Sequence, residues 1–173
     1  MAHQEQLDFF LSVKAQFPEY FHHKSVLDCG SLDVNGNLRH LFEDCSYVGV
    51  DHRKGSKVNV VSLVHELPID IQYDVVVSGE MLEHDQYWWL SLRRMFDLLV
   101  PDGLLAISAA GFGRAEHGTQ RSDGHDWGTS LNYYSNILEA DFYSVFDLPK
   151  CFKKHYIGHN LETKDIYFWG IKC

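Results

Sequence analysis

The residues of this chain that could do chemistry stand just after short apolar runs. The stretch VLDCGSLDVNGN begins with Val26 and Leu27 and changes at Asp28 to glycine, serine, aspartate and asparagine. A buried strand that ends in turn-forming residues brings its last side chains to the surface. In α/β sheets, ligands bind outside the carboxyl ends of the strands. This stretch therefore predicts one wall of a ligand pocket.

A second apolar run, YVGVD, ends at Asp51, which stands 21 residues after Gly30. An acidic residue at about this distance from the first glycine turn can accept hydrogen bonds from the two hydroxyl groups of a ribose. The spacing favours a ligand of the adenosine type. Asp is also a common turn residue after a strand, so the spacing alone leaves a purely structural role open.

Two further strand ends point to the same crevice. The run VNVV leads into Ser62 and Leu63, and the run YDVVV leads into Ser78 and Glu80. Because the carboxyl ends of parallel strands meet at one edge of a sheet, we expect these residues to line one pocket.

The elements that must position these residues alternate between strand and helix, which is typical of a doubly wound sheet. A first helix is predicted over Gln4–Phe17, where apolar residues recur at near-helical spacing until Pro18. Two extended stretches around the turn LETK predict a C-terminal β-hairpin. The predicted fold class is α/β, Rossmann-like and doubly wound, with a mostly parallel seven-stranded sheet and a C-terminal antiparallel hairpin, in a single domain over residues 1–173. The other predicted elements are strands at Ser25–Cys29, Tyr47–Val50, Val58–Val61, Asp74–Ser78 and Gly103–Ala109, and helices at Leu38–Glu43, Trp88–Leu99 and Leu131–Phe142.

Taken in order, these motifs resemble those of the class I S-adenosylmethionine-dependent methyltransferases of the small, single-domain type. VLDCGS is similar to the first motif of that family, YVGVD to its ribose-binding strand, YDVVVSGEMLEH to its fourth-strand motif and LLVPDGLLAIS to its fifth strand. The resemblance covers roughly residues 24–110. It implies S-adenosyl-L-methionine as the cofactor and methyl transfer to an unidentified small-molecule acceptor. The cofactor-binding residues that it implies are Asp28, Gly30, Ser31, Asn35, Gly36, Asp51, His52, Leu63, Ser78 and Glu80.

The sequence departs from the family pattern in two places. Leu32 and Val34 stand at the second and third glycine positions of the usual Asp-x-Gly-x-Gly-x-Gly motif. This disfavours a nicotinamide-dependent oxidoreductase, in which the glycines let the backbone approach a pyrophosphate that S-adenosylmethionine lacks. Leu63 stands where many family members have an acidic residue. The alternative function is therefore a catalytically degenerate methyltransferase fold that serves as a binding or partner subunit.

Methyl transfer needs a general base only when the acceptor must lose a proton, and histidine then suits the task. His84 is one candidate, although Glu80, Glu83 and His84 also suit the start of a helix. Residues 111–134 form a long polar stretch expected to lie over the acceptor pocket, and they contain a second candidate base, His117. No metal site is expected, because no zinc-type spacing of His and Cys is present. The residues predicted to contact the acceptor are His125, Trp127, Tyr133 and Tyr134.

The composition sets further limits. Lys and Arg number 15 against 24 Asp and Glu, and the resulting charge of -9 opposes binding to a phosphate backbone, so no nucleic acid partner is expected. The four cysteines are scattered, which indicates reduced thiols rather than a disulfide framework. No apolar run approaches the ~18 residues needed to cross a bilayer, and the first residues do not resemble a signal peptide. We therefore expect no membrane partner and a cytoplasmic location, while the oligomeric state is not indicated.

Overall fold

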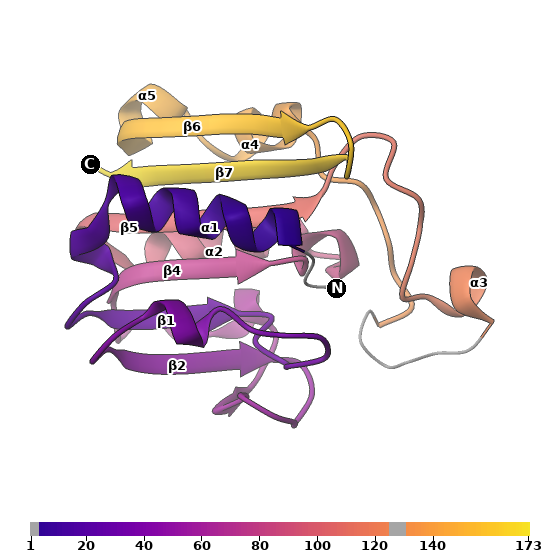
Figure 1. Cartoon of the computed structure of the whole chain (residues 1–173), viewed down its shortest axis with the longest axis horizontal. Helices are drawn as coiled ribbons and strands as arrows, with labels where there is room; N and C mark the ends of the chain where they lie inside the picture. The colour runs from indigo at the N-terminus through magenta and orange to yellow at the C-terminus, as the bar shows by residue number, and fades with distance from the viewer. Residues whose placement is uncertain (1–3, 125–130) are drawn as a thin grey trace.

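Seven strands form one sheet in the computed structural model, which describes residues 4–124 and 131–173 (Figure 1). The strands follow the order β3-β2-β1-β4-β5-β7-β6. All pairs from β3 to β5 are parallel, whereas β7 runs antiparallel to both of its neighbours. The predicted fold class, including the C-terminal hairpin, is confirmed. The strand bounds are β1 (Ser25–Cys29), β2 (Ser46–Asp51), β3 (Val60–Val61), β4 (Tyr73–Gly79), β5 (Leu99–Ala110), β6 (Phe152–Asn160) and β7 (Asp165–Lys172).

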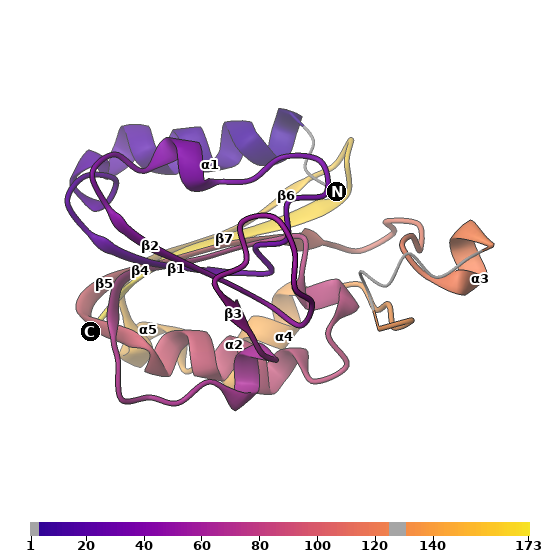
Figure 2. The same cartoon turned by 90° about the horizontal axis from the view of Figure 1, so that it is seen from below.

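Helices cover both faces of the sheet (Figure 2). Helix α1 (Gln4–Gln16) lies on one face, and α2 (Trp88–Asp97), α4 (Glu139–Val145) and α5 (Leu148–Cys151) lie on the other. Single turns of 3-10 helix, η1 (Pro18–Tyr20), η2 (Arg39–Leu41), η3 (Val64–Glu66) and η4 (Leu82–His84), occur in the connections. Within the described residues, no helix is both long and apolar enough to cross a membrane.

Strand β4 shows why the sheet is buried on both sides. Its residues Val75 and Val77 belong to the core beneath α1, and Val76 belongs to the core beneath α2. Successive side chains of a strand point to opposite faces, so a continuous apolar run is required where helices cover both faces. The chain order reverses between β1 and β4, and ligands bind at such a switch point in doubly wound sheets.

The predicted helix at Leu38–Glu43 is wrong, because only the single turn η2 forms there. Leu41 and Phe42 are consecutive and both buried, and Phe42 stacks on Phe21 with ring centroids 4.7 Å apart. Neighbouring residues of an α-helix point about 100° apart, so an extended Phe42 buries both side chains more readily than a helix would. The third strand is also shorter than predicted, with two residues in place of Val58–Val61.

The predicted helix at Leu131–Phe142 is wrong over its first part, because α4 begins only at Glu139. Leu131 and Asn132 have φ angles of 47° and 57°, in the left-handed region that a right-handed helix excludes. The segment then bonds to η4 and to the end of β5: the Ser135 amide donates to the Glu83 carbonyl and the Ile137 amide to the Ala110 carbonyl, both at 2.8 Å. The helix at Trp88–Leu99 is confirmed as α2. A further short helix, α3 (Gln120–Asp123), lies in the stretch beyond the carboxyl end of β5 (Figure 1).

Candidate active site

A cavity of about 1050 Å³ lies at the carboxyl ends of β1, β2 and β4. Every residue predicted to bind the cofactor lines this cavity except Ser78. The Ser78 side chain is buried, and its hydroxyl donates a hydrogen bond of 2.9 Å to the Cys29 carbonyl, so it ties β4 to β1. The lining residues among those predicted are Asp28, Gly30, Ser31, Asn35, Gly36, Asp51, His52, Leu63 and Glu80.

Asp51 is 9% exposed at the end of β2, and the backbone holds its carboxylate in place. The Leu32 amide donates to its Oδ2 at 3.3 Å and the Arg53 amide to its Oδ1 at 3.0 Å. His52 Nδ1 lies 3.2 Å from the same Oδ1. A carboxylate has about four lone-pair sites, so Oδ2 keeps the capacity to accept a bond from a ligand in the cavity.

Asp28 is the second-last residue of β1 and is 5% exposed. The Tyr47 hydroxyl donates to its Oδ2 at 2.8 Å. Burial raises the pKa of Asp28 to about 7, although the bond from Tyr47 and the charge of Arg39 favour the ionised form. Near neutral pH the cavity wall therefore carries a carboxyl group that is only partly ionised.

The loop after β1 reaches its shape without the usual glycine series. Gly36 has a φ of 114°, in the left-handed region that favours glycine. The Asp33 carboxylate accepts hydrogen bonds from the Gly36 amide at 2.9 Å and from Asn37 Nδ2 at 2.8 Å. Asp and Asn commonly hold turns in this way, so Asp33 was detectable from the sequence but was missed.

Gly30 is required by its neighbour as well as by its conformation. It has a φ of 83°, and a Cβ atom placed there would lie 2.6 Å from the Cβ atom of Met81. Met81, which follows the carboxyl end of β4 and also lines the cavity, was not predicted as a site residue. Other lining residues that the sequence reasoning missed include Gln6, Lys54 and Asp85.

Two carboxylates, Glu80 and Glu83, are buried between the cavity and the end of β5. Glu83 is 0% exposed, and no hydrogen-bond partner in the described part of the chain reaches the side-chain oxygens of either residue. Burial raises the pKa of both, and for Glu80 the charge of Glu83 adds to the effect. Arg114 Nη2 lies 4.0 Å from Glu80 Oε2, too far for a hydrogen bond.

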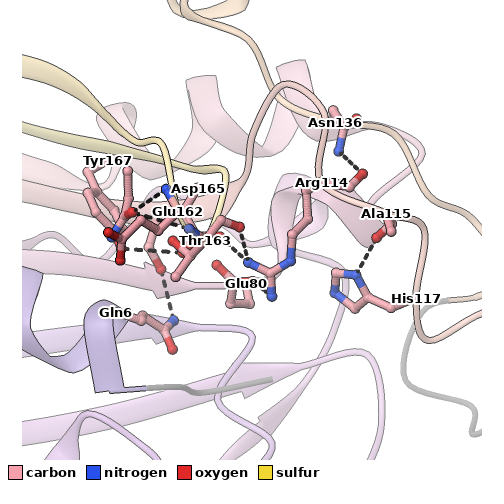
Figure 3. A network of polar contacts seen from close by, with 12 residues as sticks. Gln6, Glu80, Arg114, Ala115, His117, Asn136, Glu162, Thr163, Asp165 and Tyr167 are labelled. Carbon is pink, nitrogen blue, oxygen red and sulfur yellow. Dashed lines mark hydrogen bonds and ion pairs between the residues drawn. The ribbon is translucent and has the colours of Figure 1, made fainter.

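The Arg114 side chain bonds mainly to residues of the C-terminal hairpin (Figure 3). Its guanidinium donates to the Asp165 carboxylate and to the Thr163 carbonyl, the latter at 2.9 Å. Its own carbonyl accepts from Asn136 Nδ2 at 3.1 Å. Arg114 therefore anchors the start of the 111–124 stretch to the first residue of β7.

The two candidate bases, His84 and His117, come together at the cavity, with ring centroids 5.0 Å apart. His84 Nδ1 lies 3.4 Å from the Tyr133 carbonyl, and His117 Nδ1 lies 3.1 Å from the Ala115 carbonyl. A carbonyl only accepts, so each ring must donate from Nδ1 and hold its free lone pair on Nε2. Burial lowers the pKa of His84 to about 4 and also lowers the pKa of His117, so both rings are neutral at pH 7.

The residues predicted to contact the acceptor are less well placed. Tyr134 packs against both imidazoles, with ring centroids 5.5 Å from His84 and 5.0 Å from His117, but neither Tyr133 nor Tyr134 lines the cavity. Tyr134 instead packs its ring against the two histidines, and Tyr133 contacts His84 through its backbone carbonyl. His125 and Trp127 lie outside the described residues.

Solved structures of other proteins share this architecture. The 1,6-didemethyltoxoflavin-N1-methyltransferase of Burkholderia thailandensis, solved with S-adenosylhomocysteine, matches with a TM-score of 0.67 at 16% identity, over 98% of this chain and 78% of that one. The N-methyltransferase NodS of Bradyrhizobium japonicum, also solved with S-adenosylhomocysteine, gives 0.63 at 12% identity, over 97% and 87%. The YcgJ protein of Bacillus subtilis gives 0.64 at 13% identity, over 98% and 99%. No protein-family model and no curated protein matches the sequence.

The chain has the fold of the class I S-adenosylmethionine-dependent methyltransferases. The resemblance read from the motifs is thus confirmed for the fold. Within this methyltransferase fold, Leu63 follows β3, is half-buried and lines the cavity. This part of the cavity wall is therefore apolar rather than acidic.

Proposed function

We propose that this protein is an S-adenosylmethionine-dependent methyltransferase that acts on a small-molecule acceptor. The observation that carries the proposal is Asp51, a buried carboxylate at the end of β2 that faces the cavity and is held by two backbone amides. Such a group suits a ribose diol, because it is oriented in advance and keeps an acceptor site on Oδ2.

The remaining residues of the cavity suit the rest of such a cofactor. Gly30 brings the backbone close to the cavity, Leu63 offers apolar contact for adenine, and Asp28 and Glu80 supply oxygens on the wall between β1 and β4. Ligand pockets commonly measure roughly 300–1,000 Å³, so a cavity of about 1050 Å³ has room for a cofactor together with a small acceptor. Solved structures with this fold that contain S-adenosylhomocysteine support the same proposal.

S-adenosylmethionine, when bound, supplies an electrophilic methyl group on its sulfonium. The contribution of the chain is then to align the acceptor and to exclude water. His84 and His117 can each accept a proton on Nε2, but the low pKa of His84, about 4, makes it a weak base at neutral pH. His117, whose pKa is lowered but which is less enclosed, is the better of the two candidates.

Calorimetry with S-adenosylhomocysteine and with NAD tests the cofactor. We expect micromolar binding of the first and none of the second, and the reverse result would favour an oxidoreductase. A screen of acceptors by release of S-adenosylhomocysteine then tests turnover. Binding without turnover on any acceptor would support the alternative, a degenerate methyltransferase fold that serves as a binding or partner subunit.

A further inference from the structure

A group of possible metal ligands lies at the edge of the cavity. Glu83, His84 and His117 each offer one ligand atom, and these atoms all lie within 4.8 Å of one another. Glu83 and His84 belong to η4, directly after β4, whereas His117 comes from the stretch after β5. The fold of the sheet thus brings His117 close to Glu83 and His84, although more than thirty positions separate them in the sequence.

The orientation of both imidazoles suits metal binding. Each ring donates from Nδ1 to a backbone carbonyl, at 3.4 Å for His84 and 3.1 Å for His117, and so presents Nε2 as the lone-pair atom. Metal-binding histidines usually make such a second hydrogen bond, which fixes the tautomer and the angle of the ring. His117 Nε2 is buried and has no hydrogen-bond partner among the described residues.

The Glu83 carboxylate is a second, independent sign of a ligand. Its side chain is 0% exposed, and neither oxygen has a hydrogen-bond partner in residues 4–124 and 131–173. A polar group that is buried without a hydrogen bond is unfavourable, and a bound cation would supply the missing partner. Arg114 is bonded to Asp165 and lies 4.0 Å from the neighbouring Glu80, and no ion pair between Arg114 and Glu83 is found among the described residues.

We propose that Glu83, His84 and His117 bind one divalent transition-metal cation, through a carboxylate oxygen and the two Nε2 atoms. This set of one carboxylate and two imidazoles suits Mn²⁺, Fe²⁺ or Zn²⁺ better than Mg²⁺ or Ca²⁺, which prefer oxygen ligands. Bonds of about 2.0–2.2 Å place the ligand atoms of one ion within ~4.4 Å of one another, which is close to the 4.8 Å within which one ligand atom of each residue lies.

Three protein ligands leave coordination positions open, as in catalytic metal sites. His84 and His117 both line the cavity, so an open position could take an oxygen atom of the acceptor and orient it. With the cation bound, neither Nε2 atom would be free to act as a general base, and the cation would take over the activation of that oxygen. This part of the inference rests on the proposed methyltransferase function and points to acceptors with a hydroxyl or other oxygen donor. The cation site itself does not depend on that function.

Mn²⁺ is the best first probe, because the four free cysteines of the chain would compete for Zn²⁺. The full chain, freed of metal with a chelator, is titrated with Mn²⁺, and the loss of the electron paramagnetic resonance signal of the free ion measures binding. We expect one ion per chain and at least tenfold weaker binding in Glu83→Gln and in His117→Ala. His155→Ala, which removes an exposed histidine of β6, is the matched control and should leave binding unchanged.

The proposal is overturned if Mn²⁺ and Zn²⁺ do not bind, or if the site variants bind as the parent chain does. Urea unfolding of the same variants checks that they are folded, and calorimetry of the parent chain with S-adenosylhomocysteine tests the proposed function separately. Cation binding without S-adenosylhomocysteine binding would refute the proposed function and leave the metal site standing. The opposite result would refute the metal site alone.

Discussion

Replacing Asp28 with Asn should make the protein more stable at pH 8 than the parent chain. Burial raises the pKa of Asp28 from its ordinary value of 3.8 to about 7. The ionised form is therefore disfavoured in the folded protein by on the order of 4 kcal/mol, at about 1.4 kcal/mol for each tenfold change in proton affinity. Asn keeps the shape and an oxygen that can accept the Tyr47 hydroxyl, but it cannot ionise.

The sign of the pH effect follows from the raised pKa. The folded state binds the proton of Asp28 more tightly than the unfolded state, so its contribution is fully present below pH ~4 and is lost as the pH rises to about 7. Urea unfolding of both proteins without cofactor at pH 4, 6 and 8 measures this. The difference in unfolding free energy should grow in favour of Asp28→Asn across this range, by up to a few kcal/mol, and then level off.

Asp74→Asn is the matched control, with the opposite sign. Burial acts to raise the pKa of Asp74, but hydrogen bonds from the Ser25 hydroxyl and amide, at 2.7 and 2.8 Å, outweigh it and lower the pKa. Its stabilisation is therefore present above the unfolded pKa of ~3.9 and is lost as the pH falls further. A difference between Asp28→Asn and the parent that is independent of pH would refute the argument from burial.

Three other substitutions test the site and its supports. Asp51→Ala should weaken S-adenosylhomocysteine binding by about 2–4 kcal/mol in calorimetry, since it removes the carboxylate that we propose accepts hydrogen bonds from a ribose; unchanged affinity in a folded variant would exclude that role. Gly30→Ala should lower the unfolding free energy by roughly 1–3 kcal/mol more than Gly124→Ala does. Both glycines have a positive φ, but of the two only Gly30 has a side chain within 3 Å of the added Cβ atom. Arg114→Met should lower the unfolding free energy in urea by about 3 kcal/mol, because it removes the cation that pairs with the buried carboxylate of Asp165. Arg93→Met, at an exposed ion pair, should change the unfolding free energy by less than about 0.5 kcal/mol.

The sequence determined the strands, their order in the chain and the edge at which they present polar residues. These features depend on local signals: apolar runs such as Val75 to Val77, turn residues such as Asn35-Gly36, and the 21-residue spacing from Gly30 to Asp51. Each signal lies within a short window, so a period or a turn can be recognised without knowing what packs against it. The local signals failed where a segment had no strong period, as at 131–138, where bonds to Glu83 and Ala110 decided the conformation.

Only the tertiary structure decided which side chains meet. It placed His117 beside His84, put Met81 against Gly30, and removed Tyr133 and Tyr134 from the cavity wall. It also set the pKa of Asp28 and left the oxygens of Glu83 without a hydrogen bond from the described residues. Burial and pairing depend on distances between residues far apart in the chain, and these distances are fixed by strand register and helix packing, which no local pattern encodes.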